Sequence, residues 1–305
     1  MLERTLTFPG PVSPGHTLAP HRRGPGDPCL RIDADGTIWR TSLQRSGPVT
    51  ARVTRIAPDT VACQAWGEGA AEFVENLPAL LGADDDAAGF QPTDPTVARA
   101  HARVPHLRIG RTGRVLEALI PAILEQRVQG VDSFRSWRIL VTRFGTPAPG
   151  PAPERMRVPP PAQVWRHIPS WDFHRANVDP GRARTIIGVA SRAEALERLS
   201  AGRDDAARDY GAALTSLPGV GIWTAAETAQ RAFGDADALS IGDYHLSTMI
   251  GATLLGRPIG DAEMVELLEP MRPHRYRVVR LLEVSRLARL PRRGARLPVQ
   301  NISRL

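Results

Sequence analysis

The spacing of apolar residues changes near Pro95, and this change restricts the architectures that the chain can adopt. Over residues 38–66, apolar residues alternate with polar ones in short bursts between turn signals, a pattern typical of a β-meander. Residues 69–81 then follow the period of an amphipathic helix. The sequence therefore predicts an α+β fold, with a small antiparallel-sheet-plus-helix domain over residues 1–95 and a predominantly helical domain over residues 96–305.

Beyond residue 95 we expect helix upon helix. The predicted helices cover residues 96–103, 113–129, 132–144, 180–189, 192–199, 204–216, 222–233, 244–255, 261–271 and 275–290. Seven prolines between residues 145 and 161 predict a stiff, extended connector across the surface instead of a helix. Six prolines within residues 1–30 predict irregular chain there, with one edge strand at its start.

Every one of the 39 basic residues is an arginine, so no lysine is available to form a Schiff base. Residues 95–305 carry 31 arginines against 20 acidic residues, whereas residues 1–94 carry 8 against 12. Such a concentration of positive charge is typical of a surface that binds nucleic-acid phosphates, although solvated helix faces and tails are also rich in arginine. The net charge of +7 therefore favours a polyanionic partner without identifying it.

Other features of the composition exclude several classes of protein. With only Cys29 and Cys63, the chain cannot hold a cysteine-ligated iron–sulfur cluster or a disulfide framework. No apolar run approaches the roughly 18 residues of a membrane span, and no apolar signal-peptide segment follows the first residues. The eight histidines show no ligand spacing with acids or cysteines. We therefore expect a cytoplasmic protein with no membrane partner and no catalytic transition metal.

A short turn between two predicted helices carries the clearest functional signal. Pro218 ends the first helix, and Gly219 and Gly221 allow a tight turn from which no side chain projects. The next helix starts at Ile222, so the backbone N–H groups at its N-terminus can bind an anion such as a DNA phosphate. The candidate phosphate-binding residues are Leu217, Pro218, Gly219, Val220, Gly221 and Thr224. An ordinary proline–glycine turn between two packed helices is the alternative.

This turn and the segment after it resemble the helix–hairpin–helix DNA glycosylase superfamily. Twenty residues beyond Trp223 comes Gly242-Asp243-Tyr244-His245-Leu246, which has the superfamily's spacing of hairpin and single aspartate. The stretch Ile123-Leu124-Glu125-Gln126-Arg127-Val128 is similar to the early core helix and DNA-facing loop. Within the superfamily the likeness is closest to the 3-methyladenine DNA glycosylase II (AlkA-type) branch. The α+β N-terminal domain of that branch resembles residues 39–40, 65–67 and 80–85.

The resemblance implies that the chain flips damaged bases out of duplex DNA and releases them in base excision repair. Breaking the C1′–N bond builds positive charge on the deoxyribose, and a fixed carboxylate stabilises that charge and orients the attacking water. Asp243 is the candidate for this catalytic carboxylate. The alternative is that Asp243 only caps the helix over residues 244–255, and the two roles are compatible.

The resemblance also implies a base pocket and a limit on the chemistry. Trp223 stands where lyase-competent relatives carry a lysine, so the enzyme should be monofunctional and leave an intact abasic site. Trp223 is expected at the edge of the base pocket or, alternatively, in the core. Glu227 and Glu283 fall where the branch has aromatic rings, which hold cationic alkylated purines by cation–π attraction. These two carboxylates either contact the base or are ordinary surface charges.

An extruded base leaves a gap in the stack that a side chain has to fill. By resemblance, Gln126 and Arg127 form this DNA wedge, with Arg127 in place of the family's aliphatic residue; a solvent-facing arginine is the alternative. No cofactor is required, but the resemblance implies a monovalent cation (Na⁺ or K⁺) on the hairpin. Its expected ligands are the backbone carbonyls of Thr215, Leu217 and Val220.

The sequence thus predicts a monofunctional DNA N-glycosylase that hydrolytically releases alkylated purines such as 3-methyladenine, acting as a monomer on damaged double-stranded DNA. Two alternatives stay open: the same fold acting on another lesion, such as hypoxanthine or a deaminated pyrimidine, and a non-catalytic helix–hairpin–helix DNA-binding protein. Asp243 at the family's spacing argues against the non-catalytic protein, because binding alone has no use for a carboxylate directed at a polyanion.

Overall fold

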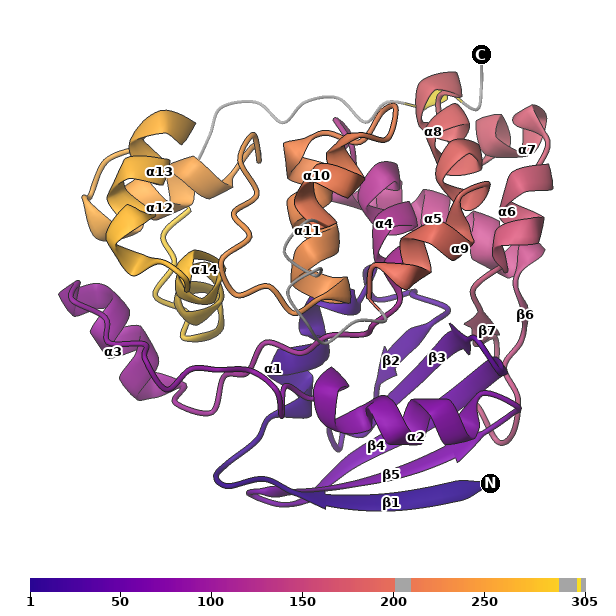
Figure 1. Ribbon diagram of the computed structural model, residues 1–305, viewed down its shortest axis with the longest axis horizontal. Coiled ribbons are helices and arrows are strands. Elements are labelled where there is room, and N and C mark those ends of the chain that lie inside the picture. Colours follow the sequence, from indigo (N-terminus) through magenta and orange to yellow (C-terminus); the bar gives the residue numbers. More distant parts are fainter. Residues whose placement is uncertain (201–209, 291–300, 303–305) are drawn as a thin grey trace.

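The computed structural model describes residues 1–200, 210–290 and 301–302, and it has the α+β organisation that the sequence predicts (Figure 1). An antiparallel sheet with one helix across its face lies at the bottom of the view. Helices fill the rest of the molecule, in one group above the sheet and another at the left.

The sheet has the strand order β1-β5-β4-β3-β2, and every neighbouring pair is antiparallel. The strands are β1 (Leu2–Thr7), β2 (Leu30–Ile32), β3 (Ile38–Gln44), β4 (Gly47–Ala57) and β5 (Thr60–Trp66). Alternate residues of β4, namely Val49, Ala51 and Val53, are buried in one apolar cluster with Phe73 of α2 (Ala70–Leu80). The period-two pattern therefore turns one face of the sheet towards α2, and the predicted meander is confirmed.

Residues 1–30 are more regular than their prolines suggested. The edge strand is confirmed as β1, but α1 (Pro14–Leu18) and a 3-10 turn (Ala19–His21) replace the irregular chain expected after it. The Ser13 hydroxyl accepts the N–H of His16, and Pro14 occupies the first helical position, where an N–H has no intrahelical partner anyway. Proline here starts a helix instead of preventing one.

Helices make up most of the chain after residue 94. They are α3 (Pro95–Arg103), α4 (Val115–Leu124), α5 (Gly130–Phe144), α6 (Ala162–His167), α7 (Ser170–Arg175), α8 (Pro180–Ala190), α9 (Ala193–Arg198), α10 (Tyr210–Thr215), α11 (Ile222–Ala232), α12 (Leu246–Leu254), α13 (Asp261–Leu268), a 3-10 turn η3 (Glu269–Met271) and α14 (Arg275–Val284). In the part of the chain that the structure describes, no helix is long and apolar enough to span a membrane.

The predicted helices are present, but several end earlier than expected. Helix α4 stops at Leu124 and α14 at Val284, and residues 204–209 of the helix expected over residues 204–216 lie outside the described residues. Helices α6 and α7 were not predicted; each directly follows a proline, Pro161 at the end of the expected connector and Pro169 beyond it. Both prolines occupy N-cap positions with extended backbone, so they begin these helices.

The proline-rich connector over residues 145–161 also differs from expectation. Its ends pair as the two-stranded sheet of β6 (Thr146–Pro147) and β7 (Arg157–Val158). The Thr41 hydroxyl of β3 donates to the Arg157 carbonyl at 2.5 Å. No helix forms over these residues, as predicted, but the connector is more ordered than expected, because pairing and docking against the main sheet satisfy some of its backbone groups.

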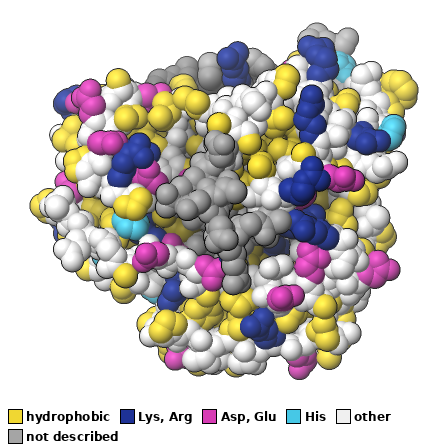
Figure 2. Space-filling view, in the orientation of Figure 1, with side chains coloured by type: hydrophobic (Ala, Val, Ile, Leu, Met, Phe, Trp, Pro, Cys, Tyr) yellow, Lys and Arg dark blue, Asp and Glu magenta, His cyan; other side chains and the backbone are white. Residues whose placement is uncertain are grey.

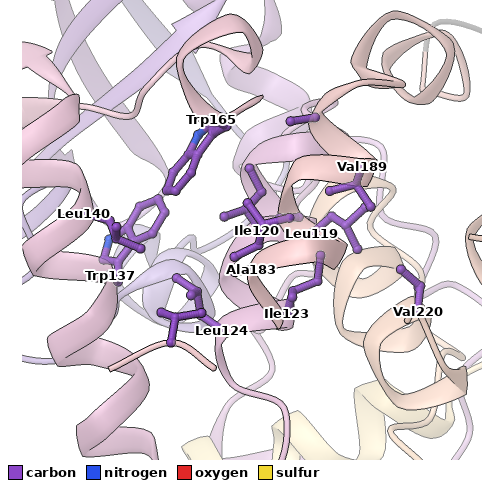
Figure 3. Close-up of a cluster of buried hydrophobic side chains, with 14 of the residues drawn as sticks. Leu119, Ile120, Ile123, Leu124, Trp137, Leu140, Trp165, Ala183, Val189 and Val220 are labelled. Atoms are coloured by element: carbon purple, nitrogen blue, oxygen red, sulfur yellow. The ribbon is translucent and has the colours of Figure 1, made fainter. Parts of the chain in front are cut away.

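Within the described residues, buried apolar side chains form three clusters. One lies between the sheet and α2, a second joins α4, α5, α8 and α11, and a third joins α3 to α12 and α14. Figure 3 shows Ile120 and Ile123 of α4 with Trp137 and Trp165 on one side and Val220 on the other. Because Val220 belongs to the predicted hairpin, the second cluster anchors that turn; the domain boundary at residue 95 stays a prediction.

Candidate active site

The predicted hairpin joins α10 to α11 at the top of the molecule in Figure 1. Gly219 has a φ of +82°, and a Cβ at this position would lie 2.1 Å from the Thr185 hydroxyl of α8. Glycine is therefore required here both for its backbone conformation and for space. Leu217 and Val220 are buried beneath the turn, whereas Gly219 and Gly221 are exposed. The hairpin thus presents bare backbone to solvent.

The N-terminus of α11 lies at this turn without a side-chain cap. Gly221 is its N-cap residue, and no side chain accepts an N–H of the first turn. Among the described residues, the N–H groups of Gly219, Gly221 and Ile222 have no hydrogen-bond acceptor. Unpaired N–H groups and the positive end of the helix dipole together favour an anion at this point.

Gln126 joins the loop after α4 to the hairpin. Its side-chain amide donates to the Gly219 carbonyl at 2.9 Å and to the Thr224 hydroxyl at 2.8 Å. Arg127, the next residue, is exposed and has a φ of +54°, which is uncommon for a residue other than glycine. The structure therefore brings the predicted wedge residues and the predicted phosphate-binding turn together.

Asp243 lies beside the same turn. Its Oδ1 atom accepts the N–H groups of His245 at 2.8 Å and Leu246 at 3.0 Å, so this oxygen caps α12. Its Oδ2 atom accepts the indole N–H of Trp223 at 3.2 Å, and Trp223 is the second residue of α11. Both Asp243 and Trp223 are partly exposed. Asp243 therefore caps a helix, as the alternative predicted. Its carboxylate is also held at the edge of the hairpin, where solvent can reach it.

Side chains of α11 hold the segment that carries Asp243. Gln230 donates to the Ser240 hydroxyl at 2.9 Å, and that hydroxyl donates to Glu227 Oε1 at 2.6 Å. Together with the bond between Trp223 and Asp243, these contacts run along α11 from its end to its start. They explain how an aspartate 20 residues beyond Trp223 returns to the hairpin.

Glu227 is enclosed in the structure. Its Oε2 atom lies 2.7 Å from Arg231 Nη1, one turn along α11, and its side chain is only 12% exposed. Burial alone would raise the pKa of Glu227, but the charge of Arg231 and the hydroxyl of Ser240 outweigh burial, and the pKa is lowered. The surface-charge alternative is therefore wrong for Glu227, while its contact with a base stays a prediction.

Glu283 is more exposed, and it pairs with Arg280 at 2.5 Å. The sequence analysis missed Tyr276, the one aromatic residue of α14, on which the charges of both Glu227 and Glu283 act. Burial raises the pKa of the Tyr276 hydroxyl. Within the described part of the chain this hydroxyl has no hydrogen-bond partner, although the side chain is 7% exposed. The sequence did offer a signal for Tyr276: it is an aromatic residue in the same predicted helix as Glu283.

A cavity between the sheet and the helices is too small for a nucleobase. Its volume of about 20 Å³ is enough for a water molecule, which needs about 10–15 Å³. His21, Arg23, Arg40 and Arg231 are among the side chains that line it. A purine therefore cannot enter this cavity unless the surrounding side chains move.

The carbonyls expected to bind a monovalent cation lie in the turn before α11. Leu217 accepts the N–H of Val220 at 3.0 Å, whereas the carbonyls of Thr215 and Val220 have no hydrogen-bond partner among the described residues. Neutral oxygens of this kind suit a singly charged ion, so the residues fit the expected site. Over residues 1–200, 210–290 and 301–302, no group of three or more His, Cys, Asp or Glu side chains could hold a metal ion.

Basic side chains run down one side of the face shown in Figure 2, over the region where α8 and α9 lie in Figure 1. Arg184 of α8 is exposed, and its neighbour Thr185 is the residue that Gly219 approaches closely. Positive charge therefore flanks the hairpin on the side of α8, where it would attract a phosphate backbone.

No protein-family model matches the chain, but a curated relative and several solved structures are similar to it. A curated relative in Mycobacterium tuberculosis, described as "Probable bifunctional transcriptional activator/DNA repair enzyme AlkA", is 33% identical over 174 residues, which cover 54% of this chain and 32% of the relative. The chain thus spans about a third of the length of the curated relatives it matches.

Two solved structures have the same fold over nearly their whole length. The 3-methyladenine DNA glycosylase from Archaeoglobus fulgidus has a TM-score of 0.76 at 17% identity and covers 93% of this chain and 98% of its own. An 8-oxoguanine glycosylase/lyase from Clostridium acetobutylicum, solved with double-stranded DNA, has a TM-score of 0.69 at 12% identity and covers 92% and 96%. The chain therefore has the fold of these two solved glycosylases, and about half of it is similar in sequence to part of the AlkA relative.

Proposed function

We propose that the chain is a monofunctional DNA N-glycosylase that extrudes an alkylated purine such as 3-methyladenine from duplex DNA and hydrolyses its bond to the sugar. The observation that carries the proposal is the position of Asp243, bonded to Trp223 beside an uncapped helix N-terminus. A DNA phosphate on that N-terminus would bring the adjoining sugar towards the carboxylate. The similarity to a DNA repair enzyme and to the 3-methyladenine DNA glycosylase from Archaeoglobus fulgidus supports this proposal.

In this mechanism the C1′–N bond breaks and its electron pair leaves with the base. Asp243 stabilises the cationic sugar that results, since its carboxylate is held in place by hydrogen bonds to both oxygens. The oxygen of a water molecule then attacks C1′ and gives a proton to the carboxylate or to solvent. The products are the free base and an abasic site in an uncut strand.

The lack of lysine supports hydrolysis without strand cleavage. No lysine can attack C1′ to form a Schiff base, and the resemblance implies that Trp223 stands where lyase-competent relatives carry a lysine. Borohydride trapping on lesion duplexes is therefore expected to give no covalent protein–DNA adduct, and strands are expected to break only after added base. Rapid strand cleavage by the protein alone would contradict a monofunctional mechanism.

Of the two wedge candidates, Arg127 is the one we propose to enter the DNA stack. The amide of Gln126 is bonded to Gly219 and Thr224, so its role is to hold the loop against the hairpin. Arg127 is exposed beside it, and a planar guanidinium can stack on bases. The proposed partner is damaged double-stranded DNA bound by a monomer, with the monovalent cation on the carbonyls before α11.

A second lesion class is favoured by one observation about the pocket. Glu227 is paired with Arg231, and Tyr276 of α14, whose side chain is 7% exposed, has a hydroxyl with no hydrogen-bond partner among the described residues. Such groups can donate to or accept from the polar edge of a neutral base, whereas a cationic purine prefers bare aromatic faces. Hypoxanthine and deaminated pyrimidines are therefore the second candidate substrates.

A panel of duplexes tests these proposals. Each duplex carries one lesion (3-methyladenine, hypoxanthine or uracil), and free base is separated by chromatography after incubation with excess protein. Release of 3-methyladenine supports the main proposal, and preferential release of hypoxanthine or uracil supports the second. Binding to duplexes with no release from any of them would refute both and leave the non-catalytic DNA-binding protein.

A further inference from the structure

An ion pair fixes the start of the loop that carries Arg127. This loop, residues 125–129, joins α4 to α5. Arg23 Nη1, from the N-terminal region, lies 2.6 Å from Glu125 Oε1, and the two side chains are 7% and 16% exposed. Glu125 is the C-cap residue of α4. Because both partners are largely buried, removing one leaves an unpaired charge at the point where the loop begins.

A second contact from the same N-terminal segment fixes the helix that follows the loop. The Arg23 N–H donates to Asp27 Oδ2 at 2.7 Å, which closes residues 23–27 into a turn. Asp27 Oδ1 accepts the indole N–H of Trp137 at 3.1 Å, and Trp137 is buried on α5. This turn therefore holds the helix before the loop and the helix after it.

The turn over residues 23–27 packs directly on α5. A Cβ at Gly24 would lie 2.9 Å from the ring of Phe134, and a Cβ at Gly26 would lie 2.8 Å from the guanidinium of Arg138. Gly24 also has a φ of +76°. The two glycines permit this close approach, so the turn meets α5 over a packed surface as well as through one hydrogen bond.

Between these anchors, Arg127 is held in the left-handed region with a φ of +54°. A non-glycine residue keeps such a conformation only where its surroundings impose it. The two residues directly before it are both held: Gln126 is bonded to the hairpin, and Glu125 is bonded to Arg23. The arrangement shapes the loop before DNA arrives.

We propose that Arg23 is a positioning residue for base extrusion: through Glu125 it holds the loop so that Arg127 is already placed to fill the gap in the stack. The inference rests on the proposed function, because it gives Arg23 a part in extrusion. An unrestrained loop would have to be ordered during extrusion, at a cost in conformational entropy, and the ion pair removes that cost in advance. The N-terminal region thereby assists base flipping indirectly, through the ion pair of Arg23 with Glu125.

The test compares Arg23→Gln with Arg40→Gln. Arg40 of β3 pairs with Glu117 of α4, and the two side chains are 5% and 16% exposed, so the control breaks an equally buried ion pair between the same two regions. Glu117 lies eight residues before Glu125, which is about 12 Å along a helix that rises 1.5 Å per residue. A loss caused by general loosening of the two regions would appear in both variants.

Two readouts are used, one with DNA and one without. Extrusion is followed as the rise in fluorescence of 2-aminopurine placed beside the lesion, and loop order is followed by hydrogen exchange of residues 125–129 in the free protein. For Arg23→Gln we expect extrusion to slow by about tenfold or more and loop exchange to rise by a similar factor, with undamaged-duplex affinity within about threefold. For Arg40→Gln we expect both readouts to stay within about threefold of the wild-type protein.

Arg23→Gln combined with Glu125→Gln is expected to extrude no more slowly than the slower single variant, because one ion pair accounts for both effects. The proposal is overturned if Arg23→Gln folds and extrudes like the wild-type protein, or if Arg40→Gln slows extrusion as much. A wild-type protein that extrudes no lesion overturns the proposed function and this role with it. Loop exchange unchanged in Arg23→Gln overturns the positioning role alone.

Discussion

Replacing Asp243 with asparagine separates its chemical role from its structural one. In the structure Oδ1 accepts two backbone N–H groups and Oδ2 accepts the indole N–H of Trp223. Asparagine caps helices about as well as aspartate, so the two backbone bonds are retained. Its Nδ2 group would then face the Trp223 N–H, a donor against a donor, and we expect the free energy of unfolding to fall by about 1–2 kcal/mol.

The effect on chemistry is expected to be larger. A carboxylate about 4 Å from a unit positive charge contributes about 4 kcal/mol at the effective dielectric constant of about 20 that suits a partly exposed site. Losing this stabilisation of the cationic sugar slows base release by about a thousandfold. Affinity for duplex DNA should change little, because the hairpin N–H groups are untouched.

Asp94→Asn provides the matched control. Asp94 caps α3 by accepting the N–H groups of Thr96 at 2.7 Å and Val97 at 3.0 Å, the same arrangement as at α12. The assay is base release with protein in excess over a lesion duplex, alongside thermal unfolding of each variant. We expect Asp94→Asn to release base at the wild-type rate. An Asp243→Asn variant that works within about threefold of the wild-type rate would refute the catalytic assignment, because about 0.7 kcal/mol is too little for a lost charge.

Three further outcomes follow from the same geometry. Gly219→Ala should lower duplex affinity by about tenfold or more in fluorescence anisotropy at fixed salt, because an alanine in the left-handed region at that close contact must move the turn. Gly221 has a φ of −91°, and a Cβ there would meet no atom within 4 Å. Gly221→Ala should therefore leave the free energy of unfolding within about 0.5 kcal/mol. Ser240→Ala leaves Glu227 without one buried donor, so we expect about 1–3 kcal/mol lower unfolding free energy and slower base release at unchanged duplex affinity. Burial lowers the pKa of His21 well below its usual value, so the unfolded chain binds this proton more readily. Stability should therefore fall as the pH drops below about 6.5, by up to about 1.4 kcal/mol per pH unit, and His21→Gln should flatten this slope in urea titrations.

Local chemistry made much of the fold and part of the site predictable. The alternating apolar pattern predicted the meander, and the Pro218–Gly221 turn predicted the hairpin, because both depend on residues close in sequence. Proline was the main source of error: it was treated as a breaker at Pro161, where it begins α6, and within residues 1–30, where Pro14 begins α1. The same residue type starts or stops a helix according to its position, which a pattern alone did not reveal.

By itself, the sequence determined that no lysine could serve a lyase and that Asp243 would accept backbone N–H groups at the start of α12. Only the tertiary structure decided which charges would meet. Glu227 pairs with Arg231 one turn away, but Arg23 pairs with Glu125 across 102 positions. Helix periods and turns are set by near neighbours, whereas the partner of a buried charge depends on how whole elements pack.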